Sequence, residues 1–138
     1  MIVDTSALVA IALREAGHLE LRAAIVSGEA LIPAPVIVEY ERVVTERGSR
    51  PNPDAQALPS VLIARGVRVA PFDADDARSA TRANTAHGEG NGRGGSLNLL
   101  DLMVFGMAQR LSLPILCTGR DFARAGANIH PASRVGEA

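Results

Sequence analysis

The chain has 138 residues, a formal net charge of −1, and 47% hydrophobic and 21% charged residues. This length and composition predict one globular domain with a substantial core. The near-zero charge gives no global positive field for coating nucleic acid, but it is compatible with an enzyme whose metal ion supplies positive charge. All 14 basic residues are arginine. The absence of lysine excludes a P-loop and Schiff-base catalysis, and it counts against receiver domains and aspartate-nucleophile phosphatases.

Cysteine content and hydropathy indicate the compartment. The single cysteine, Cys117, excludes an internal disulfide and a cysteine-built zinc site, and its apolar neighbours predict a buried, inert thiol. An acid precedes the first apolar run and no cleavage-site pattern follows it, so no secretory signal is expected. No apolar stretch approaches the roughly 20 residues of a membrane span. These features predict a cytoplasmic protein.

Short apolar runs alternate with helical patterns along the chain. Strands are expected at 1–3, 30–33, 67–70 and 113–117, with a last edge strand at 128–129. Helices are expected at 7–13, 18–27, 36–47, 54–65, 74–87 and 98–111, with a short one inside 118–125. The alternation predicts a three-layer α/β/α domain over 1–132 with a short, mainly parallel central sheet, followed by a frayed tail at 133–138.

Capping and breaking residues mark the expected helix ends. The expected N-caps are Ser6 or Thr5 for the first helix, Asp54 for the fourth, Asp73 for the fifth, and Ser96 or Asn98 for the sixth. Gly48 is expected to end the third helix, and 50–53 to form a stiff connection. Pro59 is expected to interrupt the fourth helix.

Four acidic residues lie at positions where their side chains could meet: Asp4, Glu39, Asp101 and Asp121. Asp4 and Asp121 follow apolar runs, which places them at the carboxyl edge of a parallel sheet, where open α/β sheets bind ligands. Glu39 shares a partly apolar helix face with two valines. Asp101 is the only ionisable residue in the span 96–109. An inward-facing carboxylate is costly unless it is paired or binds a metal.

Each acid also has a structural explanation. Asp4 and Asp121 are suited to capping helices, and Glu39 could be solvated or paired with Arg42 one helical turn further on. Asp101 could be stabilised by the positive N-terminus of its own helix. Together, however, two acids come from strand ends and two from helices that can flank the same edge, which favours a shared site.

A cluster of carboxylates persists only when it is protonated or neutralised by cations. Oxygen ligands without histidine or cysteine favour Mg²⁺ or Mn²⁺. Such a site suits phosphodiester hydrolysis, because one metal ion activates a water and a second ion, about 3.5–4 Å away, stabilises the leaving oxygen.

At these acids the sequence resembles the PIN-domain ribonucleases, most closely the toxins of VapBC-type toxin–antitoxin pairs. The matching segments are MIVDTSAL at 1–8, VEYERV at 38–43, LNLLD at 97–101 and TGRDF at 118–122. Their order and spacing fit the family, and the resemblance covers roughly 1–132. It implies a PIN-like fold, a Mg²⁺- or Mn²⁺-dependent endoribonuclease, a homodimer, and a VapB-type antitoxin that inserts a C-terminal segment near the acids.

The resemblance also implies roles for residues of this chain. Its catalytic, metal-binding acids would be Asp4, Glu39, Asp101 and Asp121. Thr5 or Ser6 would orient Asp4 or a bound water, and Asn98 would support Asp101. Arg120 stands where many relatives carry Asp or Asn. We therefore expect Arg120 to contact RNA or pair with an acid, and Asp121 to be either a ligand or a structural cap.

The segment 87–96 contains five glycines in ten residues, which predicts a mobile loop that matches no phosphate-binding motif. Its His87 and Arg93 could contact RNA phosphates. Two other functions remain compatible with the sequence, namely an RNA-processing nuclease of the same fold and a catalytically weak protein-binding module. The small size and the lack of an added RNA-binding domain favour the toxin.

Overall fold

The protein, described by a computed structural model over residues 1–46 and 52–136, contains a four-stranded parallel sheet. Its strands are β1 (Ile2–Val3), β2 (Leu31–Pro33), β3 (Arg68–Ala70) and β4 (Ile115–Leu116), in the order β3-β2-β1-β4. Ile2 of β1 pairs with Leu31 of β2 on one side and with Ile115 of β4 on the other. The parallel sheet predicted from the alternating pattern is confirmed, although the strands are shorter than the apolar runs.

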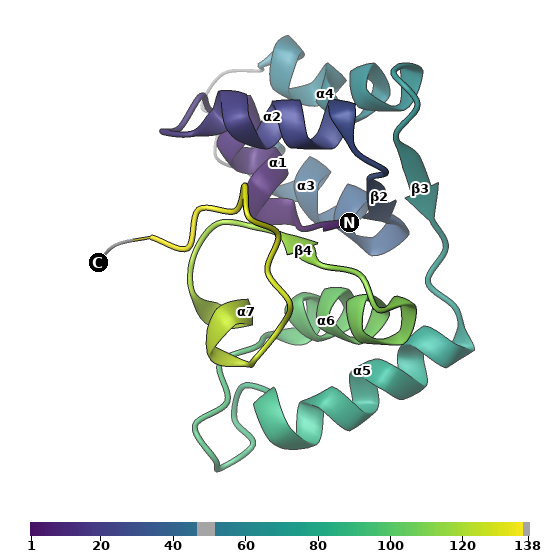
Figure 1. Ribbon diagram of the computed structural model, residues 1–138, viewed down its shortest axis with the longest axis vertical. Helices are drawn as coiled ribbons and strands as arrows, with labels where there is room; N and C mark the ends of the chain where they lie inside the picture. Colours follow the sequence, from purple (N-terminus) through teal and green to yellow (C-terminus); the bar gives the residue numbers. More distant parts are fainter. Residues whose placement is uncertain (47–51, 137–138) are drawn as a thin grey trace.

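Helices cover both faces of this sheet. They are α1 (Thr5–Ala12), α2 (His18–Ser27), α3 (Ala34–Glu46), α4 (Pro53–Ala64), α5 (Ala74–His87), α6 (Leu99–Leu111) and α7 (Asp121–Arg124). Helices α1, α2 and α4 lie on one side and α5 and α6 on the other, which confirms the predicted layers (Figure 1). Helix α3 begins directly after β2 and contacts α1, α4 and α6. No helix among the described residues is long and apolar enough to cross a membrane.

Two of the predicted helix starts are wrong and two are confirmed. Neither Ser6 nor Thr5 caps helix α1; its cap is Asp4, whose side chain accepts a hydrogen bond from the Ser6 backbone, which confirms the structural alternative given for this acid. The α4 cap is Asn52, because it precedes Pro53 at the first helical position, where proline is favoured. The caps of α5 and α6 are Asp73 and Asn98, as expected. The predicted helix end at Gly48 and residues 50–51 of the stiff connection lie outside the described residues.

Helix α4 runs uninterrupted through Pro59, contrary to the prediction. A proline inside a helix removes the N–H that would bond to the carbonyl four residues earlier, here Ala55. The buried Tyr40 hydroxyl of α3 donates to that same Ala55 oxygen at 2.5 Å. The orphaned carbonyl is therefore satisfied from a neighbouring helix, and α4 continues.

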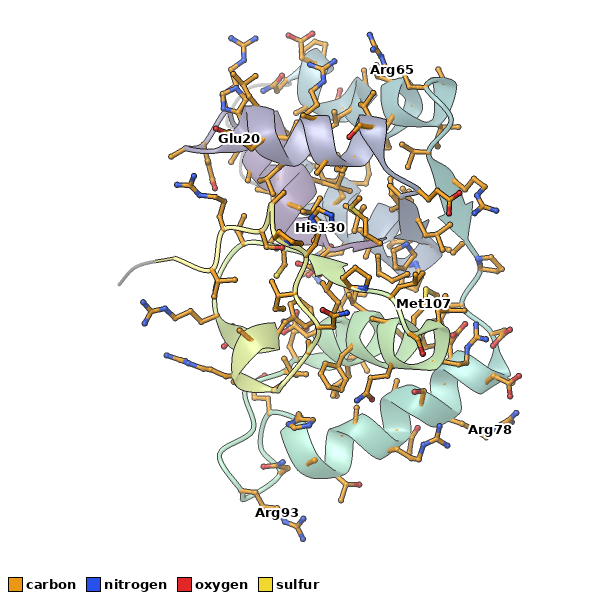
Figure 2. The ribbon with its side chains drawn as sticks, viewed as in Figure 1. Glu20, Arg65, Arg78, Arg93, Met107 and His130 are labelled. Carbon is orange, nitrogen blue, oxygen red and sulfur yellow. The ribbon has the colours of Figure 1, made fainter. Side chains whose placement is uncertain are left out.

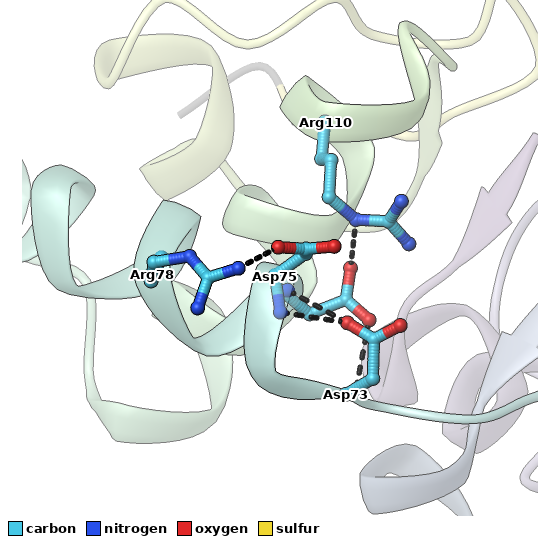
Figure 3. A network of polar contacts seen from close by, with 5 residues as sticks. Asp73, Asp75, Arg78 and Arg110 are labelled. Atoms are coloured by element: carbon cyan, nitrogen blue, oxygen red, sulfur yellow. Dashed lines mark hydrogen bonds and ion pairs between the residues drawn. The ribbon is translucent and has the colours of Figure 1, made fainter.

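Helices α5 and α6 pack closely against each other. A Cβ on Gly106 of α6 would lie 2.5 Å from the Ala80 nitrogen of α5, so only glycine fits this crossing. One helical turn away from Gly106, the Arg110 Nε of α6 donates to the fully buried Asp76 carboxylate of α5 at 2.6 Å (Figure 3). Asp76 also accepts from the Asp73 backbone N–H in the capping box of α5.

The two segments expected to be least ordered make defined backbone contacts. In the tail, the Arg134 N–H donates to the Cys117 carbonyl at 3.0 Å, just beyond β4, whereas the fraying expected for 133–138 stays a prediction. The expected edge strand at 128–129 is a single parallel bridge between Ile129 and Ile115. In the glycine-rich loop, Glu89 N–H donates to the Leu97 carbonyl at 2.8 Å and closes the loop at its base.

Candidate active site

Asp4 lies where β1 passes into α1, with only 5% of its surface exposed. Its Oδ2 accepts hydrogen bonds from the Ser6 backbone at 2.9 Å and from the Ser6 hydroxyl at 2.5 Å. The Ser6 hydroxyl oxygen in turn accepts from the Thr118 N–H at 3.0 Å, just beyond β4. Ser6 therefore ties the carboxyl ends of β1 and β4 together, a role that its position in the sequence does not reveal.

Asp101 lies in the first turn of α6, which packs on β1 and β4. The Asn98 N–H donates to Asp101 Oδ2 at 3.0 Å, and the Asp101 N–H donates to the Asn98 side-chain oxygen at 2.9 Å. This reciprocal capping box fixes the Asp101 side chain at the helix start. Because α6 leads into β4 and must run antiparallel to it, the start of α6 lies at the carboxyl edge of the sheet.

The electrostatics of Asp101 indicate which acids surround it. The pKa of Asp101 is raised to about 6, chiefly by burial and also by the carboxylates of Asp4, Glu39 and Asp121, against the lowering effect of the Asn98 N–H. Burial also raises the pKa of Asp4, with an added contribution from Glu39 and opposition from the Ser6 hydrogen bonds. Asp101 therefore lies near enough to each of the other three predicted acids to interact with it, and Asp4 lies near enough to Glu39.

Glu39 and Asp121 are held less firmly than the two central acids. Glu39 is half-buried, and the alternative pairing with Arg42 is not formed, because Arg42 bonds to Glu46 at 2.9 Å. Asp121 is the first residue of α7 and not its cap, and its side chain is 53% exposed. Its nearest cation is Arg124, at 4.0 Å between Oδ1 and a guanidinium nitrogen.

Arg120 bonds to the backbone and not to an acid, contrary to one of the two expectations for it. Its Nε donates to the Gly136 carbonyl at 2.7 Å, which ties the start of α7 to the tail. It occupies the α7 N-cap position without making a side-chain capping bond. Neither Arg120 nor Asp121 therefore caps α7 through its side chain.

Two buried polar side chains adjoin the acids. The Thr5 hydroxyl oxygen is buried and makes no hydrogen bond to any described residue. Cys117 is a buried free thiol, as predicted, and burial together with the nearby Asp4 and Asp101 carboxylates raises its pKa to about 12. The thiol is protonated at neutral pH, so it contributes neither negative charge nor a thiolate ligand.

The chemistry of the donor set fits a hard divalent cation. Four carboxylates share one edge of the sheet, and of these four only Asp121 has a basic partner within 4.0 Å among the described residues. In the arrangement described, no three acidic, histidine or cysteine side chains converge on one ion position within residues 1–46 and 52–136. Glu39 and Asp121 form no hydrogen bond through their carboxylates in these ranges, so neither side chain is held in place by one.

A groove of about 790 Å³ adjoins the acids on the side of α3 and α6. Glu39 and Asn98 line it together with apolar side chains, including Val38 and Leu99. These two apolar side chains are 71% and 74% exposed, respectively. Exposed apolar side chains gathered in one patch are a feature of interaction sites.

Comparison with known proteins places this arrangement in a family. The PIN-domain family model matches residues 1–128. The chain is 37% identical over 133 residues to ribonuclease VapC42 of Mycobacterium tuberculosis, covering 96% of this chain and 98% of the relative. It is 36% identical over 125 residues to ribonuclease VapC36 of the same species, covering 88% and 87%. The chain therefore belongs to the PIN-domain family, among the VapC ribonucleases.

Solved structures share the fold at lower identity. The M. tuberculosis toxin VapC20, which cleaves the sarcin–ricin loop, has a TM-score of 0.72 at 21% identity, covering 94% of this chain and 98% of that one. VapBC2 from Rickettsia felis, bound to a DNA fragment from its promoter, has a TM-score of 0.69 at 17% identity, covering 96% and 94%. These similarities support the PIN-like fold that the sequence motifs implied.

Proposed function

We propose that the chain is a Mg²⁺- or Mn²⁺-dependent endoribonuclease and the toxin of a toxin–antitoxin pair. The observation that carries the proposal is the group formed by Asp101 and the three carboxylates near it. Three members of this group of four have no basic partner within 4.0 Å among the described residues. Charges of one sign are held together at a cost that a bound cation removes. The names of the VapC relatives support RNA as the substrate.

The four acids would bind the metal ion in two ways, according to how firmly the fold holds each side chain. Asp4 and Asp101 each use Oδ2 for hydrogen bonds within the fold, which leaves Oδ1 for a ligand. Glu39 and Asp121 would complete the ligand set after rotating inward. A divalent ion held there supplies positive charge and activates water for attack on a phosphodiester.

Other residues would position these groups. Ser6 and Asn98 fix the orientations of Asp4 and Asp101 through the hydrogen bonds described above. The Thr5 hydroxyl, which lacks a protein partner in the described chain, is suited to holding an ordered water. Arg93 and the remaining N–H groups of Arg120 would contact RNA phosphates.

The proposed partners are a VapB-type antitoxin and a second copy of the chain. The apolar groove beside Glu39 would receive the antitoxin's C-terminal segment, which would silence the site by covering its acids and burying Val38 and Leu99. The similarity of the fold to VapBC2, itself a toxin–antitoxin complex, supports an antitoxin as a partner. The homodimer is proposed by analogy with the family.

Direct metal binding tests the proposal. Purified, antitoxin-free protein should bind Mn²⁺ in isothermal titration calorimetry, and Asp4→Asn should weaken that binding strongly. Asn keeps the acceptor for the Ser6 hydrogen bonds, so the fold should persist. Asp54→Asn, at an exposed acid on α4, is the matched control and should bind as the wild type does. Folded wild-type protein that binds neither Mn²⁺ nor Mg²⁺ would refute the proposal.

A further inference from the structure

A polar hollow, separate from the apolar groove, lies between the glycine-rich loop, the end of α5 and α7. Its volume is about 250 Å³. We call it the arginine pocket, and the residues that matter to it are His87, Arg93, Gly95, Ser96 and Arg124. Two guanidinium groups and an imidazole line it, and no carboxylate of a described residue does. Its charge is therefore opposite to that of the acid cluster.

The two arginines of the pocket are available for a ligand. Within the described residues, the Arg93 side chain forms no hydrogen bond or ion pair, and it extends from the loop into solvent (Figure 2). Arg124 has a single ion-pair partner there, Asp121, at 4.0 Å. Both side chains of that pair are more than half exposed, at 66% and 53%, so the pair is weak and easily exchanged for a stronger one.

The loop that forms one wall of the pocket has a defined shape. The Asn91 side-chain oxygen accepts from the Arg93 N–H at 2.8 Å and from the Gly95 N–H at 3.2 Å. A Cβ on Gly95 would lie 2.3 Å from the Gly88 carbonyl oxygen, so the two ends of the loop approach as closely as only glycine permits. On the inner side, the His87 ring packs against Phe105 with centroids 5.2 Å apart.

The pocket adjoins the acid cluster through α7. Arg124 and Asp121 are three residues apart on this helix, and the Asp121 carboxylate is one of those that raise the pKa of Asp101. An RNA strand approaching the acids meets a repulsive site until cations are bound. A cationic pocket next to that site offsets the repulsion and fixes the direction of the strand.

We propose that the arginine pocket binds a backbone phosphate of the RNA strand, next to the phosphodiester presented to the acids. Arg124 contacts the phosphate from α7, and Arg93 folds over it from the loop. His87 and the Ser96 hydroxyl supply further donors. This inference rests on the proposed nuclease function for the identity of the ligand, whereas the anion site itself does not depend on cleavage.

Binding without cleavage tests the inference. The affinity of a fluorescein-labelled 12-nucleotide oligouridylate is measured by anisotropy in EDTA at several NaCl concentrations, for wild type, Arg93→Gln, Arg124→Gln and the double variant. Each substitution should weaken binding about tenfold, as expected for loss of a charged hydrogen bond. The double variant should also lower the slope of log K against log salt by about 0.7, the contribution of the one phosphate that the pocket neutralises on a single strand.

Two controls separate the pocket from general charge. Arg82→Gln removes an exposed arginine from α5 outside the pocket and should leave the salt slope unchanged. Inorganic phosphate should shift the amide NMR signals of Gly95 and Ser96 in the wild type and not in the double variant. Unchanged RNA affinity and slope in the double variant would overturn the inference, even if inorganic phosphate still binds.

The outcomes for the two proposals are distinguishable. RNA binding that depends on Arg93 and Arg124, without cleavage under any metal condition, would refute the nuclease and keep the pocket. Metal-dependent cleavage with RNA binding insensitive to both substitutions would keep the nuclease and refute the pocket.

Discussion

Asp101→Asn should stabilise the metal-free protein while removing a proposed ligand. Asn keeps the side-chain size and an oxygen that can accept from the Asn98 N–H, so the capping box persists. The rise in the Asp101 pKa from 3.8 to about 6 corresponds to about 3 kcal/mol at 1.36 kcal/mol per unit. Because this carboxyl is partly exposed, solvent screening reduces the expected gain to about 1–2 kcal/mol at pH 7.

The pH dependence of this gain follows from the direction of the pKa shift. The folded protein holds the Asp101 proton more tightly than the unfolded chain, so ionisation costs nothing below pH 3.8 and its cost grows as pH rises to about 6. Urea unfolding in EDTA from pH 4.5 to 8 should therefore show a difference between variant and wild type that widens with pH and levels off above about 6.5. A variant less stable at pH 7, or a difference independent of pH, would refute this reasoning.

Asp76→Asn is the matched control for that experiment. Asp76, like Asp101, is an acid at the start of a helix, but it is fully buried and paired with Arg110 at 2.6 Å. Removing its charge leaves the guanidinium without its partner and should cost about 2 kcal/mol at pH 7. Opposite signs of the change in unfolding free energy for Asp101→Asn and Asp76→Asn would show that the instability belongs to the acid cluster and not to acids at helix starts in general.

The remaining predictions concern the fold that positions the site. Tyr40→Phe should cost about 1–3 kcal/mol in chemical unfolding, because it leaves the Ala55 carbonyl without a donor. In a Pro59→Ala background, the cost of Tyr40→Phe should fall by about 1 kcal/mol, because the new N–H at position 59 can donate to the same Ala55 carbonyl. Equal costs in both backgrounds would contradict the explanation. Gly106→Ala should destabilise the protein by about 1–3 kcal/mol through its clash with Ala80, and a neutral effect on the melting temperature would show that α5 and α6 can separate without cost.

The layers and the gathering of the acids could be predicted because both depend on local pattern. Apolar runs ending at Asp4 and before Asp121 specify strands whose carboxyl ends share one edge once the sheet is parallel. Asp101 is an isolated charge in an otherwise apolar helix start, where burying a carboxylate costs free energy. Its presence there therefore indicates a function or a compensating contact. Local periodicity contains this information without reference to distant contacts.

The features that sequence did not predict depend on contacts between distant segments. Nothing near Pro59 indicates that Tyr40 will satisfy the carbonyl it orphans, so an interrupted helix was the natural expectation. Ser6 was expected to cap α1, but its hydroxyl instead links Asp4 to Thr118, which lies 112 residues further along the chain. The arginine pocket was missed in part because Arg124 approaches the glycine-rich loop only in the folded protein.

Cleavage of total cellular RNA by the purified protein tests the central claim most directly. Reactions with Mg²⁺, Mn²⁺ or EDTA would compare wild type with Asp4→Asn, Glu39→Gln and Glu41→Gln. Glu41 is exposed and lies on the same helix as Glu39, which makes it the matched control. We predict discrete fragments that require a divalent ion, persist in Glu41→Gln, and disappear in the other two variants. Cleavage that continues in EDTA, or that survives both Asp4→Asn and Glu39→Gln, would contradict a metal-dependent nuclease built on these acids.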